Sequence, residues 1–249
     1  MLDEYGDDLA VIFVESQGAD ARRAESFAYE RGWMGRGAFW TRERPASTGL
    51  GYLPSFILLD AEGTVLMKGN TASMKSKIAD AVEDQIKQAA QLPEGLDKDF
   101  KKAWKALREG DWATAAERID KQAAEGGELA VQAEVLRARL TAALEGTVAG
   151  IEKQIEIGYL VEARAEAERL HSATKGLDEW HTRAASLLEG LDSDGMADEI
   201  KAAEAFSKLY AKVCADGIED NVRKLEKFAA KYPDTLAASR AKHLLSIGE

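Results

Sequence analysis

The sequence predicts an α/β segment over residues 1–91, followed by an all-α segment over residues 98–249. Three observations lead to this fold class. Residues 9–15, LAVIFVE, form a nearly continuous β-branched and aromatic run, which is typical of a strand buried on both faces of a mostly parallel sheet. Ala61-Glu62-Gly63 separates two short apolar runs, as a hairpin turn does. After residue 97 strand formers thin out, and apolar residues recur at helical intervals.

The first segment is expected to have the order β-α-β-β-α. Apolar alternation, glycine positions and helical periodicity set the boundaries of its elements. The expected elements are a strand over 9–15, a helix over 19–31 closed by Gly32, a long irregular connection over 35–51, strands over 55–60 and 64–68, and an amphipathic helix over 73–91 that begins at Ser73.

Pro93 and Gly95 mark a linker over residues 92–97, and about eight helices are expected after it. Short helices joined by short turns predict stacked antiparallel hairpins. The helix breaks are expected near Gly110, Gly126-Gly127, Gly146 to Gly150, Gly158, Gly176, Gly190 to Gly195, Gly217 and Tyr232-Pro233.

Three of these hairpins resemble the tetratricopeptide repeat in the placing of small and aromatic residues. The stretches are AWKALREGDWATAAERI, IEKQIEIGYLVEARAEAERL and LEKFAAKYPDTLAASRAKHLL. Gly110, Gly158 and Gly217 lie 48 and 59 residues apart. A regular array of tetratricopeptide repeats has a period of about 34 residues. The pattern is therefore a degenerate repeat, and generic helical-hairpin packing explains it equally well.

The formal net charge of −11 disfavours nucleic-acid binding, because acidic and basic residues are interspersed rather than gathered into basic patches. No apolar run approaches the roughly 18 residues that a membrane span needs, and no targeting signal is visible. The single cysteine, Cys214, excludes an intrachain disulfide, a CxxC pair and a cysteine-based zinc site within this chain.

The stretch LPSFILLDAEGTVLMKGN, together with the β-α-β-β-α order, resembles the second half of a thioredoxin fold, and most closely the TlpA/ResA type of extracytoplasmic thiol-disulfide oxidoreductase. The resemblance covers about residues 1–91. It implies that Pro54 is the cis proline that opens a strand, that the backbone of Leu53 can pair with an extended polypeptide, and that Asp60 to Gly63 is the following turn. Position alone also fits an ordinary proline at the start of a strand.

The redox half of that fold has no counterpart here. The resemblance implies that the strand leading into the CxxC lies between 9–15 and 55–60, so these two strands would share no hydrogen-bonding partner without it. MLDEYG, residues 1–6, looks like the last turn of the helix that follows the redox pair. We therefore expect that the chain begins inside a domain, either as a fragment or because Met1 is an internal methionine. The alternative is a half-domain completed by a partner strand.

Other candidate residues are weaker. Trp40, in the tract FWTRERPASTG, is expected to border the proline loop. Together with Leu53 and Pro54 it is expected to form a substrate-binding groove, to which Glu15 contributes. The alternative is that Trp40 only anchors an ordinary surface loop. Cys214 is expected to be a buried packing residue. His171, His181 and His243 are too scattered in sequence for a metal site on one helix. No catalytic residue, metal or cofactor is predicted.

The resemblance implies thiol-disulfide exchange or a related redox role in an intact form, with a helical protein-interaction domain. The chain itself lacks the cysteine pair, so a non-catalytic protein-binding or scaffold module is the alternative. We expect a protein or peptide partner, no nucleic acid and no integral membrane segment. An extracytoplasmic location follows from the resemblance only.

Overall fold

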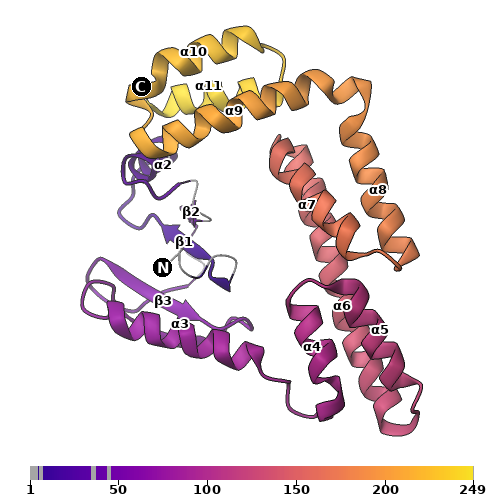
Figure 1. Ribbon diagram of the computed structural model, residues 1–249. Coiled ribbons are helices and arrows are strands. Elements are labelled where there is room, and N and C mark those ends of the chain that lie inside the picture. Colours follow the sequence, from indigo (N-terminus) through magenta and orange to yellow (C-terminus); the bar gives the residue numbers. More distant parts are fainter. Residues whose placement is uncertain (1–4, 6–7, 35–37, 44–45, 249) are drawn as a thin grey trace. The chain divides into compact units, whose positions relative to one another are not determined.

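The computed structural model describes residues 5, 8–34, 38–43 and 46–248. Figure 1 labels its helices and strands along the chain. The predicted class is confirmed: a small region of strands and helices is followed by a long series of helices. The chain divides into two compact units. The first contains the described residues within 1–91, 211–222 and 246–249, and the second contains residues 92–210 and 223–245.

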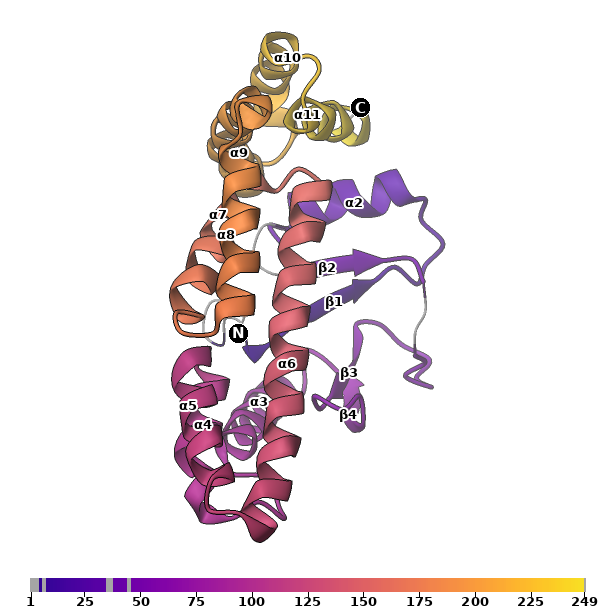
Figure 2. The same cartoon turned by 90° about the vertical axis from the view of Figure 1, so that its right-hand side faces the viewer.

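The first sheet consists of β1, Val11–Val14, and β2, Ala38–Thr41, which pair in parallel with Val11 opposite Ala38 (Figure 2). The prediction that residues 35–51 form only an irregular connection is therefore wrong, because β2 lies within them. This strand is four residues long and is surrounded by glycines and a proline. Its AFWT stretch contains good strand formers, but it is too short for a periodic signal to emerge from such flanks.

The prediction that β1 is buried on both faces is also wrong. The strand alternates, with Ile12 57% exposed and Val14 40% exposed, while Val11 and Phe13 are half-buried. The Phe13 ring stacks on Trp33 with 4.1 Å between centroids, and Trp33 meets Phe27 edge-on at 5.5 Å. Aromatic stacking thus attaches one face of β1 to the region of α2, and the other face remains open.

Helix α2, Ala21–Glu30, and helix α3, Lys75–Ala90, fall within the predicted ranges. Asp20 is the N-cap of α2, and its side chain accepts a hydrogen bond from the backbone of Arg23. Helix α3 begins two residues later than predicted. The side chain of Asn70 accepts from the backbones of Ala72 and Ser73 and holds these residues in a turn before the helix.

The second sheet is the predicted hairpin. Strand β3, Ser55–Leu59, pairs antiparallel with β4, Val65–Asn70. Asp60 Oδ1 accepts from the backbone N–H groups of Glu62 and Thr64 at 3.1 and 2.7 Å, and Gly63 donates to the Asp60 carbonyl at 3.1 Å. Gly63 has φ +84°, a conformation that a residue without Cβ adopts at little cost. The aspartate and the glycine together fix the turn.

Helices α4 and α5 lie side by side in Figure 1, as do α7 and α8, in agreement with predicted helical hairpins at these two places. The bounds of the helices in the second segment are α4 Lys101–Arg108, α5 Trp112–Ala123, α6 Gly127–Glu156, α7 Leu160–Ala173, α8 Asp178–Asp192, α9 Ala197–Asp216, α10 Val222–Lys231 and α11 Leu236–Gly248, with short 3₁₀ turns at Lys98–Phe100, Asp194–Met196 and Glu219–Asn221.

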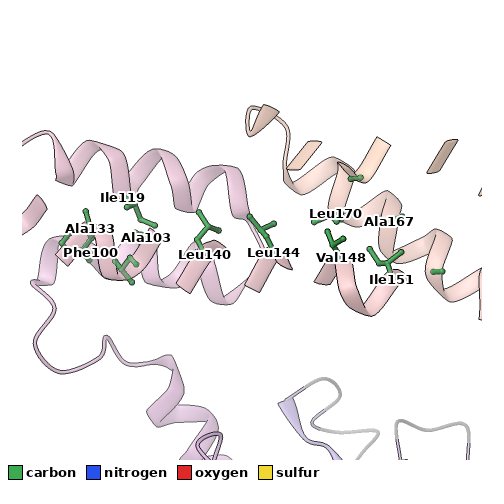
Figure 3. Close-up of a cluster of buried hydrophobic side chains, with 13 residues drawn as sticks. Phe100, Ala103, Ile119, Ala133, Leu140, Leu144, Val148, Ile151, Ala167 and Leu170 are labelled. Atoms are coloured by element: carbon green, nitrogen blue, oxygen red, sulfur yellow. The ribbon is translucent and has the colours of Figure 1, made fainter. Parts of the chain in front are cut away.

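Helix α6 contradicts one predicted break, because it continues through Gly146 and Gly150. Each glycine costs a helix about 1 kcal/mol relative to alanine. Here that cost is outweighed by a buried row on the opposite face that includes Leu144, Val148 and Ile151. Figure 2 shows α6 along its whole length, and Figure 3 shows the row that it contributes to the core. Packing therefore overrides the local preference to break.

A cationic side chain joins three regions of the second unit. The Arg240 guanidinium on α11 lies over the rings of Tyr159, Phe206 and Tyr210, with 3.6, 4.8 and 5.5 Å to their centroids. It also donates a hydrogen bond from Nη1 to the carbonyl of Gly158 at 3.1 Å. These contacts combine cation–π attraction with a charge-assisted hydrogen bond. The turn between α6 and α7 is thereby held against α9 and α11.

Gly158 is the residue of this turn that tolerates least change. Its φ is +80°, and a Cβ built on it would lie 2.8 Å from the Cβ of Leu236 on α11. Real Cβ atoms do not approach that closely, so a side chain here would displace α11 as well as strain the backbone.

We predict that Gly158→Ala lowers the free energy of unfolding by at least about 1–2 kcal/mol, from the backbone conformation alone. Gly146→Ala is the matched control, because Gly146 is helical and a Cβ there meets nothing within 4 Å. That variant should raise stability by up to about 1 kcal/mol. Urea unfolding followed by circular dichroism measures both. Equal effects of the two substitutions would contradict the assigned role of Gly158.

Candidate functional site

The candidate site lies where the chain enters β3. Tyr52, Leu53 and Pro54 are all exposed, and Leu53 is 53% accessible although it is apolar. The Leu53–Pro54 peptide bond is cis, the form that the resemblance implies. Ser55, the next residue, already pairs with Asn70 of β4. An exposed apolar dipeptide therefore leads directly into a hydrogen-bonded strand.

The strands beside this point have free edges. Among the described residues, β1 pairs with β2 and β3 pairs with β4, and no ladder joins the two sheets. The sequence predicts this separation, because strands 9–15 and 55–60 would share no hydrogen-bonding partner without a strand between them. Two-stranded sheets leave one row of backbone N–H and C=O groups per strand available for pairing. Such edges can accept an added strand.

Trp40 does not lie on the same sheet as the proline loop. It sits on β2, in register opposite Phe13, and its side chain is half-buried. Leu53 and Pro54 precede β3, which belongs to the other sheet. The hydrogen bonds and ring contacts of the described residues do not connect Trp40 with Leu53 or Pro54. Its part in a groove therefore stays a prediction.

Glu15 has a local role that the sequence did not suggest. Its carboxylate accepts from the backbone N–H of Gln17 at 2.6 Å and from that of Gly18 at 3.1 Å. Desolvation raises the pKa of this carboxyl, but the backbone donors Gln17, Ala19 and Gly18 and the charge of Arg42 lower it more, so the pKa lies below the ordinary 4.5. Glu15 thus orders the turn that follows β1.

Because the folded pKa of Glu15 is lowered, its contribution to the order of this turn is complete above about pH 4.5 and is lost as pH falls through the folded value. We predict that the amide chemical shifts of Gln17 and Gly18 titrate together with a midpoint below 4.5, measured by two-dimensional NMR.

Glu15→Gln should abolish that titration and speed amide exchange of Gln17 and Gly18 several-fold at neutral pH. Glu62→Gln, which changes an exposed carboxylate in the β3–β4 turn, is the control and should leave both amides unchanged. A titration midpoint at or above 4.5 in the unaltered protein would refute this role of Glu15.

Two histidines that are ten residues apart in sequence come together in the fold. The rings of His171 and His181 stack with 3.9 Å between centroids, and Nδ1 of His181 lies 2.9 Å from the His171 carbonyl. Spacing along one helix could not reveal this pair, because His171 lies on α7 and His181 on α8. Among the described residues, no group of three metal-binding side chains is present.

Cys214 lies on α9 and is half-buried rather than buried as predicted. As the chain has a single cysteine, the thiol cannot form an intrachain disulfide. Among the residues that the structure describes, no helix combines the length and apolar character needed to cross a bilayer.

No known protein family, curated protein or solved structure matches this chain. Its function is therefore inferred from its own residues and geometry.

Proposed function

We propose that the chain is a protein-binding module whose first unit receives an extended segment of a partner protein beside Leu53 and Pro54. The observation that carries this proposal is the exposed dipeptide at the start of β3, a strand that pairs only with β4 among the described residues. A partner segment would add as a strand: its backbone would pair with a free edge, and its apolar side chains would cover exposed ones.

The exposed apolar surface of the first unit supports this chemistry. Ile12 and Val14 lie on the open face of β1, and Tyr52 and Leu53 lie at the entrance to β3. Isolated two-stranded sheets are at best marginally stable in water, and a third strand improves them by pairing backbone groups and burying apolar area. A bound segment would therefore gain affinity from main-chain hydrogen bonds and selectivity from its alternate side chains.

The order β1-α2-β2-β3-β4-α3 and the position of Pro54 are compatible with a thioredoxin-like origin of this segment. In an intact form, the same surface would hold a substrate for thiol-disulfide exchange. Dithiol exchange requires two thiols, and this chain supplies only Cys214. Dithiol exchange therefore needs at least one further thiol from outside this chain, whereas polypeptide binding does not.

The second unit would add a second protein-binding surface. Its α4–α5 and α6–α7 helix pairs, with the positive-φ glycines Gly110 and Gly158 in their interhelical turns, are compatible with a degenerate tetratricopeptide-like arrangement. The side chain of Asp111 caps α5 by accepting from the Thr114 backbone at 3.3 Å. Helical hairpins of this kind present side chains on adjacent faces to protein partners.

We predict that Leu53→Arg weakens binding of S-carboxymethylated α-lactalbumin, a permanently unfolded chain without free thiols, by about tenfold or 1.4 kcal/mol. The charged side chain would oppose burial of the β3 entrance. Fluorescence anisotropy of the labelled probe measures the affinity. Val65→Arg is the matched control, because Val65 is on β4 of the same hairpin and, like Leu53, 53% exposed.

Equal losses in both variants would mean general apolar attraction and would overturn the proposed site. Unchanged binding in Leu53→Arg would overturn it too. Circular dichroism and thermal unfolding of each variant establish that it is folded before its affinity is interpreted.

We further predict that the chain does not catalyse insulin reduction by dithiothreitol above the uncatalysed rate, and that Cys214→Ser leaves this result unchanged. A dithiol mechanism needs a second thiol to resolve the mixed disulfide, and none exists in the chain. Turbidity of the precipitating insulin B chain gives the rate. Catalysis that disappears in Cys214→Ser would contradict the non-catalytic assignment.

A further inference from the structure

Helices α7 and α9 of the second unit together line an open cavity of about 220 Å³. Its apolar wall comes from Leu160, Val161 and Ala165 on α7 and from Ile200 on α9. Leu160 is fully buried and belongs to a small core with Leu191 and Ala203, so this wall rests on packed side chains. All of the residues that line the cavity belong to the second unit.

Three charged residues complete the lining. Arg164 lies on α7, and its guanidinium Nη2 donates to Asp192 at the end of α8. Asp192 offsets the charge of Arg164, while the buried Nε of Arg164 has no hydrogen-bond partner among the described residues. The other two are carboxylates that face the cavity from the two helices, Glu168 on α7 and Glu204 on α9.

Glu168 and Glu204 are both exposed, and neither forms an ion pair with any residue that the structure describes. Arg164 stands one helical turn before Glu168, where an i,i+4 pair could form, yet it turns to Asp192 instead. On α9, Lys201 and Lys208 flank Glu204 at three and four residues without pairing to it. The cavity therefore combines an apolar wall with two carboxylates that have no ion-pair partner among the described residues.

We propose that this cavity binds the side chain of a lysine from a protein partner. The methylene stem would lie against Leu160, Val161 and Ile200, and the ammonium group would lie between Glu168 and Glu204. Lysine is amphipathic in this sense, with an apolar stem and a compact charged end. The volume suits one long side chain, being below the range of about 300–1,000 Å³ for sites of drug-sized ligands.

Other ligand classes fit the lining less well. An anion would be repelled by the two carboxylates, since Arg164 is already paired with Asp192. A purely apolar side chain would desolvate Glu168 and Glu204 without giving either a partner, which costs free energy. Arginine has a broad planar head that demands bidentate geometry, whereas an ammonium group can be shared by two separate carboxylates.

The test uses the full chain labelled with ¹⁵N and titrated with N-acetyl-lysine N-methylamide. The proposal predicts saturable shifts at the amides of Val161, Ala165 and Ile200. N-acetyl-norleucine N-methylamide, which has an uncharged side chain of similar length, should bind at least about tenfold more weakly, a difference of about 1.4 kcal/mol. Equal affinities for the two probes, or no saturable shifts at these amides, would overturn the proposal.

Two variants locate the site. The double variant Glu168→Gln and Glu204→Gln should weaken binding by about tenfold or more, because both charge partners are lost. The double variant Glu162→Gln and Asp198→Asn removes the same charge from exposed positions on the same helices outside the cavity, and it should bind like the unaltered chain. Equal losses in both would show a general charge effect and overturn the site.

Ala165→Trp provides a steric test, because an indole would fill the cavity while Glu168 and Glu204 remain. Binding should be lost; retained binding in a folded variant would overturn the assignment. If this variant does not fold, the Glu168→Gln and Glu204→Gln double variant still tests whether the cavity binds the probe. Butylammonium distinguishes the source of the ligand: shifts with butylammonium but not with N-acetyl-lysine N-methylamide would indicate a site for a free amine and refute a lysine of a protein.

Discussion

The second unit depends on the buried row of α6. Leu136, Leu140, Leu144, Val148 and Ile151 recur at intervals of three or four residues, and each is buried. Phe100 and Ile119 lie near one end of the row, and Ala167 and Leu170 lie near the other end (Figure 3). Truncation of one such leucine to alanine typically costs about 2–5 kcal/mol. One helix therefore unites hairpins that would otherwise form separate cores.

The segment of residues 5–91 lacks an equivalent constraint of its own. Within the described part of residues 5–91, the buried apolar side chains are Ala28 and Tyr29 on α2 and Ile78 and Val82 on α3. The strands contribute half-buried side chains, and their sheets do not join. The stability of such a region is low per residue, because little apolar area offsets the conformational entropy lost on folding. A surface of this kind gains more from a bound strand than a complete sheet would.

The sequence identified features that have a local cause. Asp60 and Gly63 determine their turn through their own backbone and side-chain chemistry, and Gly110, Gly158 and Gly217 end helices by adopting positive φ. The features it missed are set by distant residues. Gly146 remains helical because the opposite face of α6 is packed, β2 exists because β1 offers it a partner, and His171 meets His181 only once α7 and α8 have folded together.

The two candidate sites also differ in whether the local sequence predicts them. The position of Pro54 before a strand can be inferred from the residues around it, but the carboxylates Glu168 and Glu204 are 36 residues apart and share a cavity only through the crossing of two helices. Within α7, Arg164 precedes Glu168 by four residues, a spacing at which an ion pair along the helix can form. Arg164 instead pairs across to Asp192, which no single-helix pattern can show.

The Arg240 contact distinguishes this helical unit from an open solenoid. In a solenoid each repeat contacts only its immediate neighbours. A repeat can therefore be inserted or removed without changing the contacts of the terminal repeats. Here a side chain on α11 binds a carbonyl 82 residues earlier in the chain, at Gly158. A hairpin inserted between these positions would carry the cation away from its three aromatic rings. The position of α11 is therefore coupled to a turn far from it in sequence, and not only to its neighbouring helices.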